Sequence, residues 1–296
     1  MEARQLFEEA NRRYWNELES IPIPRFFLFP YDLVDEVREG NWPFLIERMV
    51  SGELLETINL MNAWQCYLFD WSIWAKILPT FDDNDRWTLQ LQHVDPLAFT
   101  CMYQPSAMRD RFCMVATNAL HQANLIVLPG YEDRLDQDNL RTGRFLNRGQ
   151  KENQLVRIGK PWARFGELQT GLQAINTADY QRVTRNFRNQ ASHALAPRFE
   201  IGETNTVVRY MAPKEKMVAQ PDGTFALVQD VTRMVVHYGF GGTPPLKYET
   251  IVAENQKQHA LGADTLKAYQ TLLKEVLQKI GIRTGTSASC SRSATG

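Results

Sequence analysis

The sequence predicts a mainly α protein, a helical bundle with a small antiparallel β meander inserted before its last helix. Apolar residues recur at helical spacing over several long segments. Residues from about 199 to 252 are instead rich in β-branched and aromatic residues, with turn signals between them. Because amphipathic helices must bury their apolar sides against one another, the helical segments together require a bundle.

Five helices are predicted before the meander, each from apolar residues at helical spacing. Proline ends two of them, because it lacks the backbone N–H that a continuing helix needs. The fifth begins at Asn176, where an amide side chain followed by an early acid is typical of a helix N-terminus. Residues from about 130 to 160 are polar and show no clear period. The predicted ranges are 1–20, 43–78, 105–128, 161–175 and 176–196.

The meander is expected to turn at Pro221-Asp222-Gly223 and again at the GGTPP run of residues 241–245. Its last strand is expected in LKYETIV, residues 246–252. A final amphipathic helix follows, and one stripe of it carries Leu266, Tyr269, Leu273, Val276, Leu277 and Ile280. Three regions are therefore expected: an N-terminal helical extension (1–50), a helical domain that contains the β insertion (51–282) and a disordered polar tail (283–296).

Composition limits the classes of function. The chain has 33 basic and 34 acidic residues, so nucleic-acid binding would have to come from local clusters of charge. The four cysteines form no C-x-x-C pair, which argues against a zinc knuckle and a dense disulfide framework and suits a reducing cytosol. The most apolar window, residues 63–78, contains Asp70 and Lys76 and is too short to span a bilayer. We expect a cytoplasmic protein with no membrane association, no metal site and no cofactor.

The helix predicted from Asn176 to Ala196 has two sides of different composition. An advance of about 100° per residue places an apolar set, Tyr180, Val183, Phe187, Ala191 and Ala194, on the core side. The opposite side carries Arg185, Arg188, Asn189, Ser192 and His193. Arginine presents a planar fork that matches phosphate oxygens, and histidine exchanges a proton near neutral pH. These are the side chains that metal-independent cleavage of a phosphodiester requires.

The run Arg188-Asn189-Gln190-Ala191-Ser192-His193 resembles the R-x(4–6)-H motif of the HEPN superfamily. The resemblance covers this motif and a coarse order of helices. It implies a helical bundle, ribonuclease activity in a toxin or phage-defence setting, and a homodimer in which two motifs form one active site. It also implies catalytic roles for Arg188, Asn189 and His193, RNA binding by Arg185 and Ser192, and a possible antitoxin or other regulatory partner.

Two details qualify the resemblance. Leu195 stands where a toxin subgroup has the tyrosine that a modifying antitoxin targets, so regulation by that route is not expected. A second R-x(4–6)-H match runs from Arg86 to His93, but Trp87 follows its arginine. That match also lies in a segment with strand-like alternation, and we discount it for both reasons.

A basic stretch between residues 140 and 165 is a candidate RNA-binding surface. It has one acid, Glu152, and three interleaved aromatic residues (Phe145, Trp162 and Phe165) that could stack on bases. Its seven basic residues are Arg141, Arg144, Arg148, Lys151, Arg157, Lys160 and Arg164. We expect Arg157, Lys160 and Arg164 to contact RNA. The alternative is a solvated loop and helix face.

Two alternatives to a ribonuclease remain open from the sequence. The same polar side could bind RNA, a nucleotide or an acidic partner protein in a regulatory module that performs no chemistry. In a purely structural interpretation, Arg188 and His193 would be hydrogen-bonded within the chain, for instance to backbone carbonyls of the β meander.

Overall fold

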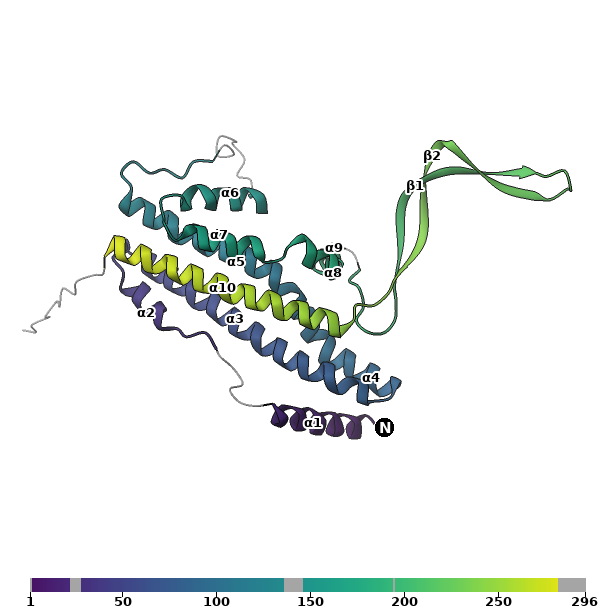
Figure 1. Ribbon diagram of the computed structural model, residues 1–296, viewed down its shortest axis with the longest axis horizontal. Coiled ribbons are helices and arrows are strands. Elements are labelled where there is room, and N and C mark those ends of the chain that lie inside the picture. Colours follow the sequence, from purple (N-terminus) through teal and green to yellow (C-terminus); the bar gives the residue numbers. More distant parts are fainter. Residues whose placement is uncertain (1, 22–27, 136–145, 194, 282–296) are drawn as a thin grey trace, which may run out of the picture. The chain divides into compact units, whose positions relative to one another are not determined.

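The computed structural model describes residues 2–21, 28–135, 146–193 and 195–281. Contacts within the chain divide it into two units, one formed by residues 1–181 with 252–296 and the other by residues 182–251. The first unit is helical, and the second contains a two-stranded antiparallel sheet and a short helix (Figure 1). The mainly α fold with a small antiparallel sheet before the last helix is therefore confirmed.

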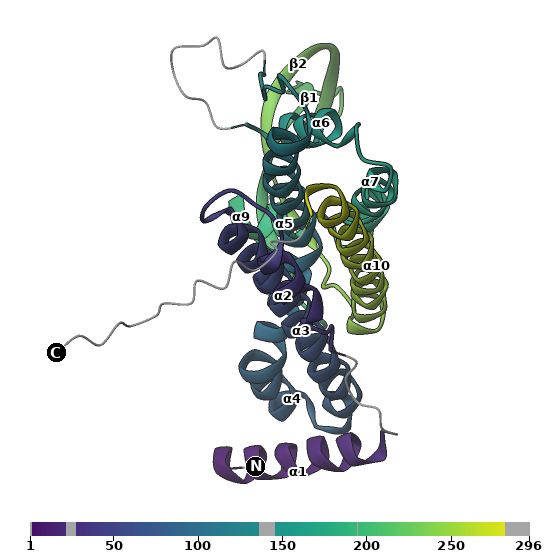
Figure 2. The same cartoon turned by 90° about the vertical axis from the view of Figure 1, so that its left-hand side faces the viewer.

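Three long helices form the centre of the first unit: α3 (Ile46–Ile77), α5 (Asp95–Val127) and α10 (Tyr248–Ile280), which enters this unit at Val252. They lie side by side in both views of the ribbon (Figures 1 and 2). Trp64 of α3, Phe112 of α5 and Tyr269 of α10 are among the largest fully buried side chains. The Tyr269 hydroxyl donates to the carbonyl oxygen of Val115 at 3.3 Å, so this buried phenol is satisfied. All six apolar residues predicted for the stripe of the last helix are buried.

Shorter helices surround this centre. One of them, α7 (Phe165–Ala174), approaches α10 closely at Gly171, where an added Cβ would lie 2.6 Å from the Thr265 hydroxyl oxygen, so only glycine fits. The shorter helices are α1 (Ala3–Ser20), α2 (Asp32–Glu39), the 3-10 turn η1 (Leu78–Thr80), α4 (Asp83–Leu89), the π-helix η2 (Gln90–Val94), α6 (Arg148–Gly159), α7 (Phe165–Ala174) and α8 (Ala178–Val183).

The helices differ from the sequence expectation in three places. α5 begins at Asp95, ten residues before the predicted start, because the buried Pro105 lies inside the helix instead of opening it. α6 occupies part of the stretch that showed no period, and a capping box between Asn147 and Gln150 starts it. The segment from residue 86 to 93 is helical, so the strand-like interpretation of it was wrong.

The predicted domain boundary at residue 50 falls within α3. The tail 283–296 lies outside the described residues.

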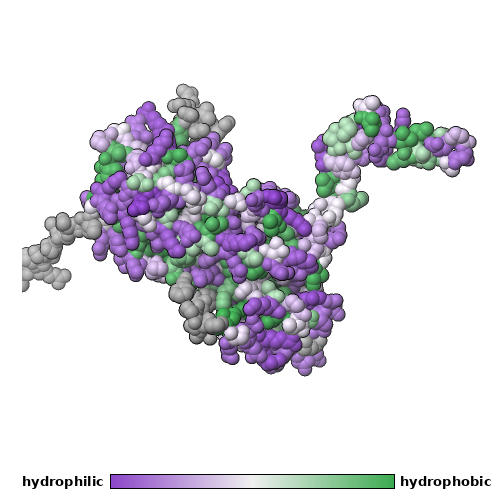
Figure 3. Space-filling view, in the orientation of Figure 1, coloured by the Kyte–Doolittle hydropathy of each residue, from purple (hydrophilic) through white to green (hydrophobic). Residues whose placement is uncertain are grey.

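The sheet of the second unit is one long hairpin. β1 (Thr204–Ala219) pairs antiparallel with β2 (Phe225–Thr243), in a register that places Thr204 opposite Thr243 and Ala219 opposite Phe225. The turn predicted at Pro221-Asp222-Gly223 joins the two strands, and Gly223 has the left-handed φ of 82° that such a turn requires. Figure 3 shows hydrophobic residues exposed along this ribbon.

The expected last strand of the meander is absent from the described residues. Gly241 to Thr243 end β2, and no hairpin turn forms at GGTPP. Most of LKYETIV lies in the first turns of α10, which begins at Tyr248. The β-branched and aromatic residues of this segment had suggested a strand. The segment is helical instead, because tertiary packing overrides the intrinsic propensity of individual residues.

Candidate functional site

The helix predicted from Asn176 to Ala196 is two helices. α8 ends at Val183, and α9 (Phe187–His193) follows a bend in which Arg185 and Asn186 both have φ of 52°. These left-handed conformations break the helical period, so the angular relation predicted between Arg185 and the motif on α9 was wrong. Val183, which was expected in the core, is exposed. Ala194 lies outside the described residues.

A single aromatic side chain anchors α9. Phe187 is buried and stacks on Phe199 with ring centroids 5.3 Å apart, and Phe199 stacks on Tyr248 at 5.9 Å. Backbone hydrogen bonds from Glu200 N to Leu246 O (2.9 Å) and from Leu246 N to Arg198 O (2.8 Å) join the segments that lead into and out of the hairpin. The anchor therefore holds α9 at the base of the hairpin.

The motif residues lie on the exposed part of α9. Arg188, Asn189, Ser192 and His193 are all exposed. Ser192 lies four residues after Arg188, and His193 lies four residues after Asn189, so each pair is one helical turn apart on the same side of α9. The side chains of Arg188, Asn189 and His193 form no hydrogen bond or ion pair with any residue that the structure describes. The structural interpretation, in which Arg188 and His193 bond to carbonyls of the hairpin, thus has no support in the described chain.

A pocket of about 550 Å³ lies between the 185–197 segment and the start of the hairpin. Arg185 and Arg209 both line it, and no acidic residue does, so its electrostatic potential favours an anion. Arg185 donates a hydrogen bond from Nη1 to the carbonyl oxygen of Pro244, which restrains the guanidinium. Gln190 connects the pocket to α9, and its apolar wall includes Leu195 and Val207. Arg209 was not among the predicted site residues, because its strand-like segment contains no motif that would mark this arginine as a ligand-binding residue.

The predicted RNA-binding residues of the basic stretch belong to the other unit, and acids neutralise two of them. Arg157 forms an ion pair with Asp133. Arg164 donates from Nη1 to Glu167 Oε1 at 2.8 Å, whereas Lys160 is exposed. These partners reduce the positive charge that the local sequence suggests.

Two of the three aromatic residues of that stretch are not exposed for base stacking. Trp162 and Phe165 are buried in the helical core, so the expectation that they are available to stack on bases was wrong. The ammonium group of Lys279 lies 4.5 Å from the centroid of Trp162 and adds a cation–π contact. Phe145, Arg141 and Arg144 lie outside the described residues.

The second R-x(4–6)-H match is part of the packing between helices. Arg86 forms an ion pair with Asp83, and His93 lies in the π-helix η2, where its ring stacks on Trp74. Burial lowers the pKa of His93. Both ends of this match have structural partners, which distinguishes it from the exposed match on α9.

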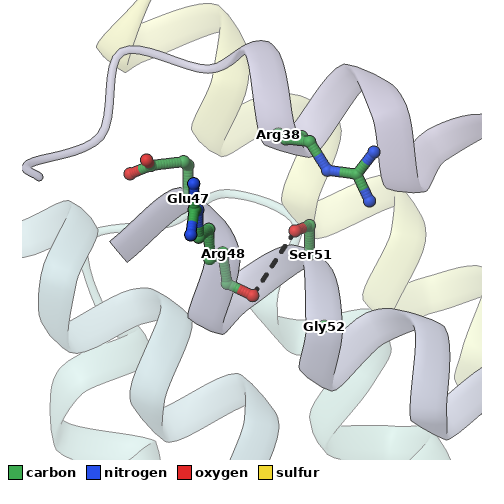
Figure 4. Close-up of a pocket in the computed structure, with 5 residues that line it drawn as sticks. All are labelled: Arg38, Glu47, Arg48, Ser51 and Gly52. Carbon is green, nitrogen blue, oxygen red and sulfur yellow. Dashed lines mark hydrogen bonds between the residues drawn. The ribbon is translucent and has the colours of Figure 1, made fainter. Parts of the chain in front are cut away.

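Another pocket, in the helical unit, is lined by Arg38 of α2 and by the first turns of α3 (Figure 4). The Arg38 guanidinium forms an ion pair with Asp35 at 2.9 Å, and the Ser51 hydroxyl lies 3.5 Å from the carbonyl oxygen of Arg48. In Figure 4 the carboxylate of Glu47 and the guanidinium of Arg38 point away from each other. The pocket thus contains one carboxylate, that of Glu47, and the guanidinium groups of Arg38 and Arg48.

Comparison with protein-family models, with curated proteins and with solved structures gives no match to this chain. The HEPN resemblance of Arg188–His193 stays a prediction. Over the described ranges, no helix combines the length and the apolar character needed to cross a membrane.

Proposed function

We propose that this chain is a metal-independent endoribonuclease of the HEPN type, with its active site on α9. The observation that carries the proposal is the exposed group of Arg188, Asn189 and His193, which have no partner among the described residues. Phe187 holds the opposite side of the same short helix, so the helix presents these side chains from a fixed base. Within the part of the chain that the structure describes, this cationic fork, amide and imidazole are not engaged elsewhere, so they could bind and transform a phosphodiester.

The proposed reaction is attack of an RNA 2′-hydroxyl on the adjacent phosphorus, in line with the 5′-oxygen that leaves. The O–P bond that forms closes a 2′,3′-cyclic phosphate, and the P–O bond that breaks releases a 5′-hydroxyl. His193 takes the proton from the attacking hydroxyl or gives one to the leaving oxygen. Arg188 stabilises the negative charge that gathers on the phosphorane, and Asn189 orients the phosphate or the imidazole.

Two copies of α9 complete the site in this proposal. A reaction of this kind needs one group that accepts a proton and one that donates a proton, and a single His193 performs both only in turn. In a homodimer, the imidazole of one copy accepts the proton while the other donates. Such an enzyme is a toxin or phage-defence effector that an antitoxin or another regulatory partner would restrain.

The pocket beside α9 provides a place for the RNA backbone next to the reacting phosphate. Arg185 and Arg209 would bind a flanking phosphate, while Ser192 on α9 would contact the chain near the reacting group. In the helical unit, Lys160, Arg157 and Arg164 would bind RNA more weakly, because two of these three already have acidic partners.

The test is cleavage of an end-labelled RNA by the purified chain in the presence of a metal chelator. We expect products with 2′,3′-cyclic phosphate ends, and a loss of rate of about 10²- to 10⁴-fold in His193→Ala and in Arg188→Ala. Arg233→Ala is the matched control, since Arg233 is an exposed arginine of the same unit that does not line the pocket. A wild type without activity, or alanine variants as active as the wild type, would refute the proposal.

A second candidate is a non-catalytic module that binds RNA or a nucleotide. The pocket favours it specifically, because two arginines and no acid line a cavity that also has an apolar wall. Binding without any cyclic phosphate product would support this module in place of the ribonuclease.

A further inference from the structure

The pocket beside α9 offers more than a phosphate group requires. Its volume of about 550 Å³ lies in the range of cavities that hold whole small-molecule ligands. Arg185 and Arg209 match the charge of a phosphate, but three apolar side chains, Leu195, Pro197 and Val207, line the same cavity. A phosphate gains nothing from an apolar wall, whereas a nucleobase buries its ring against one. The pocket thus has room and surface for a base as well as for a phosphate.

Three uncharged polar side chains of the pocket are available to a ligand. Gln190, Thr206 and Thr243 line it, and their side chains form no hydrogen bond with any residue that the structure describes. Thr204, in contrast, already bonds to the backbone of the segment 196–198. An amide and two hydroxyls provide both donors and acceptors. The edge of a base requires both kinds of group, whereas a phosphodiester only accepts hydrogen bonds.

The strand surface beside these hydroxyls is bare. Gly241 pairs with Thr206 across the hairpin, so the two residues face the same side of the sheet. A Cβ added at Gly241 would meet only Val208 Cγ2 within 4 Å, at 3.8 Å, and the space above the glycine is therefore open. Glycine inside a strand often marks a place where a ligand approaches the backbone closely. A flat ring fits such a surface.

Gln190 connects this pocket to the proposed catalytic residues. It belongs to α9 and lies three residues before His193, so the two side chains leave the helix on neighbouring rows, with Cβ atoms about 5 to 6 Å apart. A base that contacts Gln190 and a phosphate at His193 can therefore belong to neighbouring positions of one RNA strand. The pocket would hold the nucleotide next to the bond that is cleaved.

We propose that this pocket is a base-selective nucleotide site, which determines the sequences at which the chain cleaves RNA. The role in cleavage rests on the proposed ribonuclease, whereas selective binding of a nucleotide does not. Arg185 and Arg209 hold the phosphate without regard to sequence, as phosphate contacts do. The base packs on the apolar wall, and the Gln190 amide pairs with its edge, which leaves polar groups unpaired when the wrong base enters. Only an unstacked base can enter, so the RNA must be single-stranded at this position.

Binding of nucleoside 5′-monophosphates to the full chain tests the site without any cleavage. The probes are the monophosphates of adenosine, guanosine, cytidine and uridine, with ribose 5-phosphate as the ligand that lacks a base. Isothermal titration calorimetry measures each affinity. We expect one nucleotide to bind at least about tenfold more tightly than ribose 5-phosphate and than the least favoured nucleotide. Ribose 5-phosphate that binds as tightly as all four nucleotides overturns the proposal, because the pocket would then be a phosphate site only. A chain that binds none of the four overturns it as well.

Gln190→Ala separates recognition of the base from binding of the phosphate. It should reduce the differences among the four nucleotides to less than about threefold and leave the affinity for ribose 5-phosphate unchanged. Gln229→Ala is the matched control, since Gln229 is an exposed glutamine of β2 that does not line the pocket. This control should keep the wild-type order of affinities. Unchanged selectivity in Gln190→Ala, or an equal loss in Gln229→Ala, contradicts the assignment.

Cleavage of single-stranded RNAs distinguishes a failure of this site from a failure of the ribonuclease. The wild type should prefer one base at a fixed position beside the cleaved bond, and Gln190→Ala should lose that preference. Selective nucleotide binding by a chain that cleaves no RNA would refute the ribonuclease and leave the nucleotide site standing. Cleavage with no preference at any position beside the bond would refute the role of the site and leave the ribonuclease standing.

Discussion

The imidazole of His93 stacks on the indole of Trp74, with ring centroids 4.7 Å apart and planes 3° from parallel. Phe7 meets the same imidazole edge-on at 5.7 Å, so the contact joins α1, α3 and the π-helix η2. Burial lowers the pKa of His93, and burial also lowers the pKa of His259, whose ring lies edge-on to Trp64 at 5.1 Å. Both histidines are thus more costly to protonate in the folded chain than in the unfolded one.

Replacing His93 by phenylalanine should reduce the sensitivity of the fold to acid. The folded-state pKa lies below the ordinary 6.5, so the unfolded chain binds more protons just below that pH and stability falls as pH decreases through that window. Phenylalanine keeps the stacked ring and removes one titrating group. The loss of Tm between pH 7 and pH 5 should be smaller in His93→Phe than in the wild type. Equal losses of Tm in His93→Phe and in the wild type would contradict the prediction.

Removing the side chain of Asn124 should destabilise the helical unit by about 2 to 4 kcal/mol. This fully buried amide accepts a hydrogen bond from Trp162 Nε1 at 2.8 Å and donates one to Ile158 O at 2.9 Å. Asn124→Ala leaves a buried indole N–H and a buried carbonyl without these partners. Urea unfolding measures the difference. The exposed Asn153→Ala in α6 should change stability by less than about 0.5 kcal/mol.

The bend before α9 can be tested at Asn186, whose φ is 52°. Alanine pays a cost of about 1 kcal/mol in this left-handed conformation and glycine does not, so Asn186→Gly should be the more stable of the two variants. In one continuous helix the order would be reversed, because glycine is about 1 kcal/mol less favourable than alanine there. Thermal unfolding of the two variants therefore distinguishes the bend from the helix that the sequence suggested.

Arg209 should contribute to RNA binding through the pocket beside α9. If it contacts a phosphate, Arg209→Ala should weaken binding of different RNA sequences equally and reduce the slope of log affinity against log salt by about 1. Fluorescence anisotropy at several salt concentrations measures both effects. Arg233→Ala removes the same charge outside the pocket, and an equal change in that variant would show that the effect is not specific to the pocket.

The long amphipathic helices could be predicted because their sequences repeat the spacing of a buried stripe. Leu266, Tyr269 and Leu273 are buried in α10 where their period placed them. α6 was missed because its buried positions, Leu155 and Ile158, are too few to show a period, although Asn147 and Gln150 already contained its capping box. Pro105 was taken as a helix start because proline is usually costly inside a helix. In α5 it lies inside the helix, and the packing that accommodates it is not visible in the local sequence.

By itself, the sequence determined the mainly α class, the turn at Pro221-Asp222-Gly223 and the polar composition of the motif from Arg188 to His193. These features depend on local spacing and on side-chain chemistry, which neighbouring residues in the chain reveal. Only the tertiary structure decided that the helix breaks at Arg185 and Asn186, that Phe187 anchors α9, and that Trp162 is buried. The physical reason is that burial and left-handed backbone conformations are stabilised by contacts between segments far apart in the chain, which no local pattern contains.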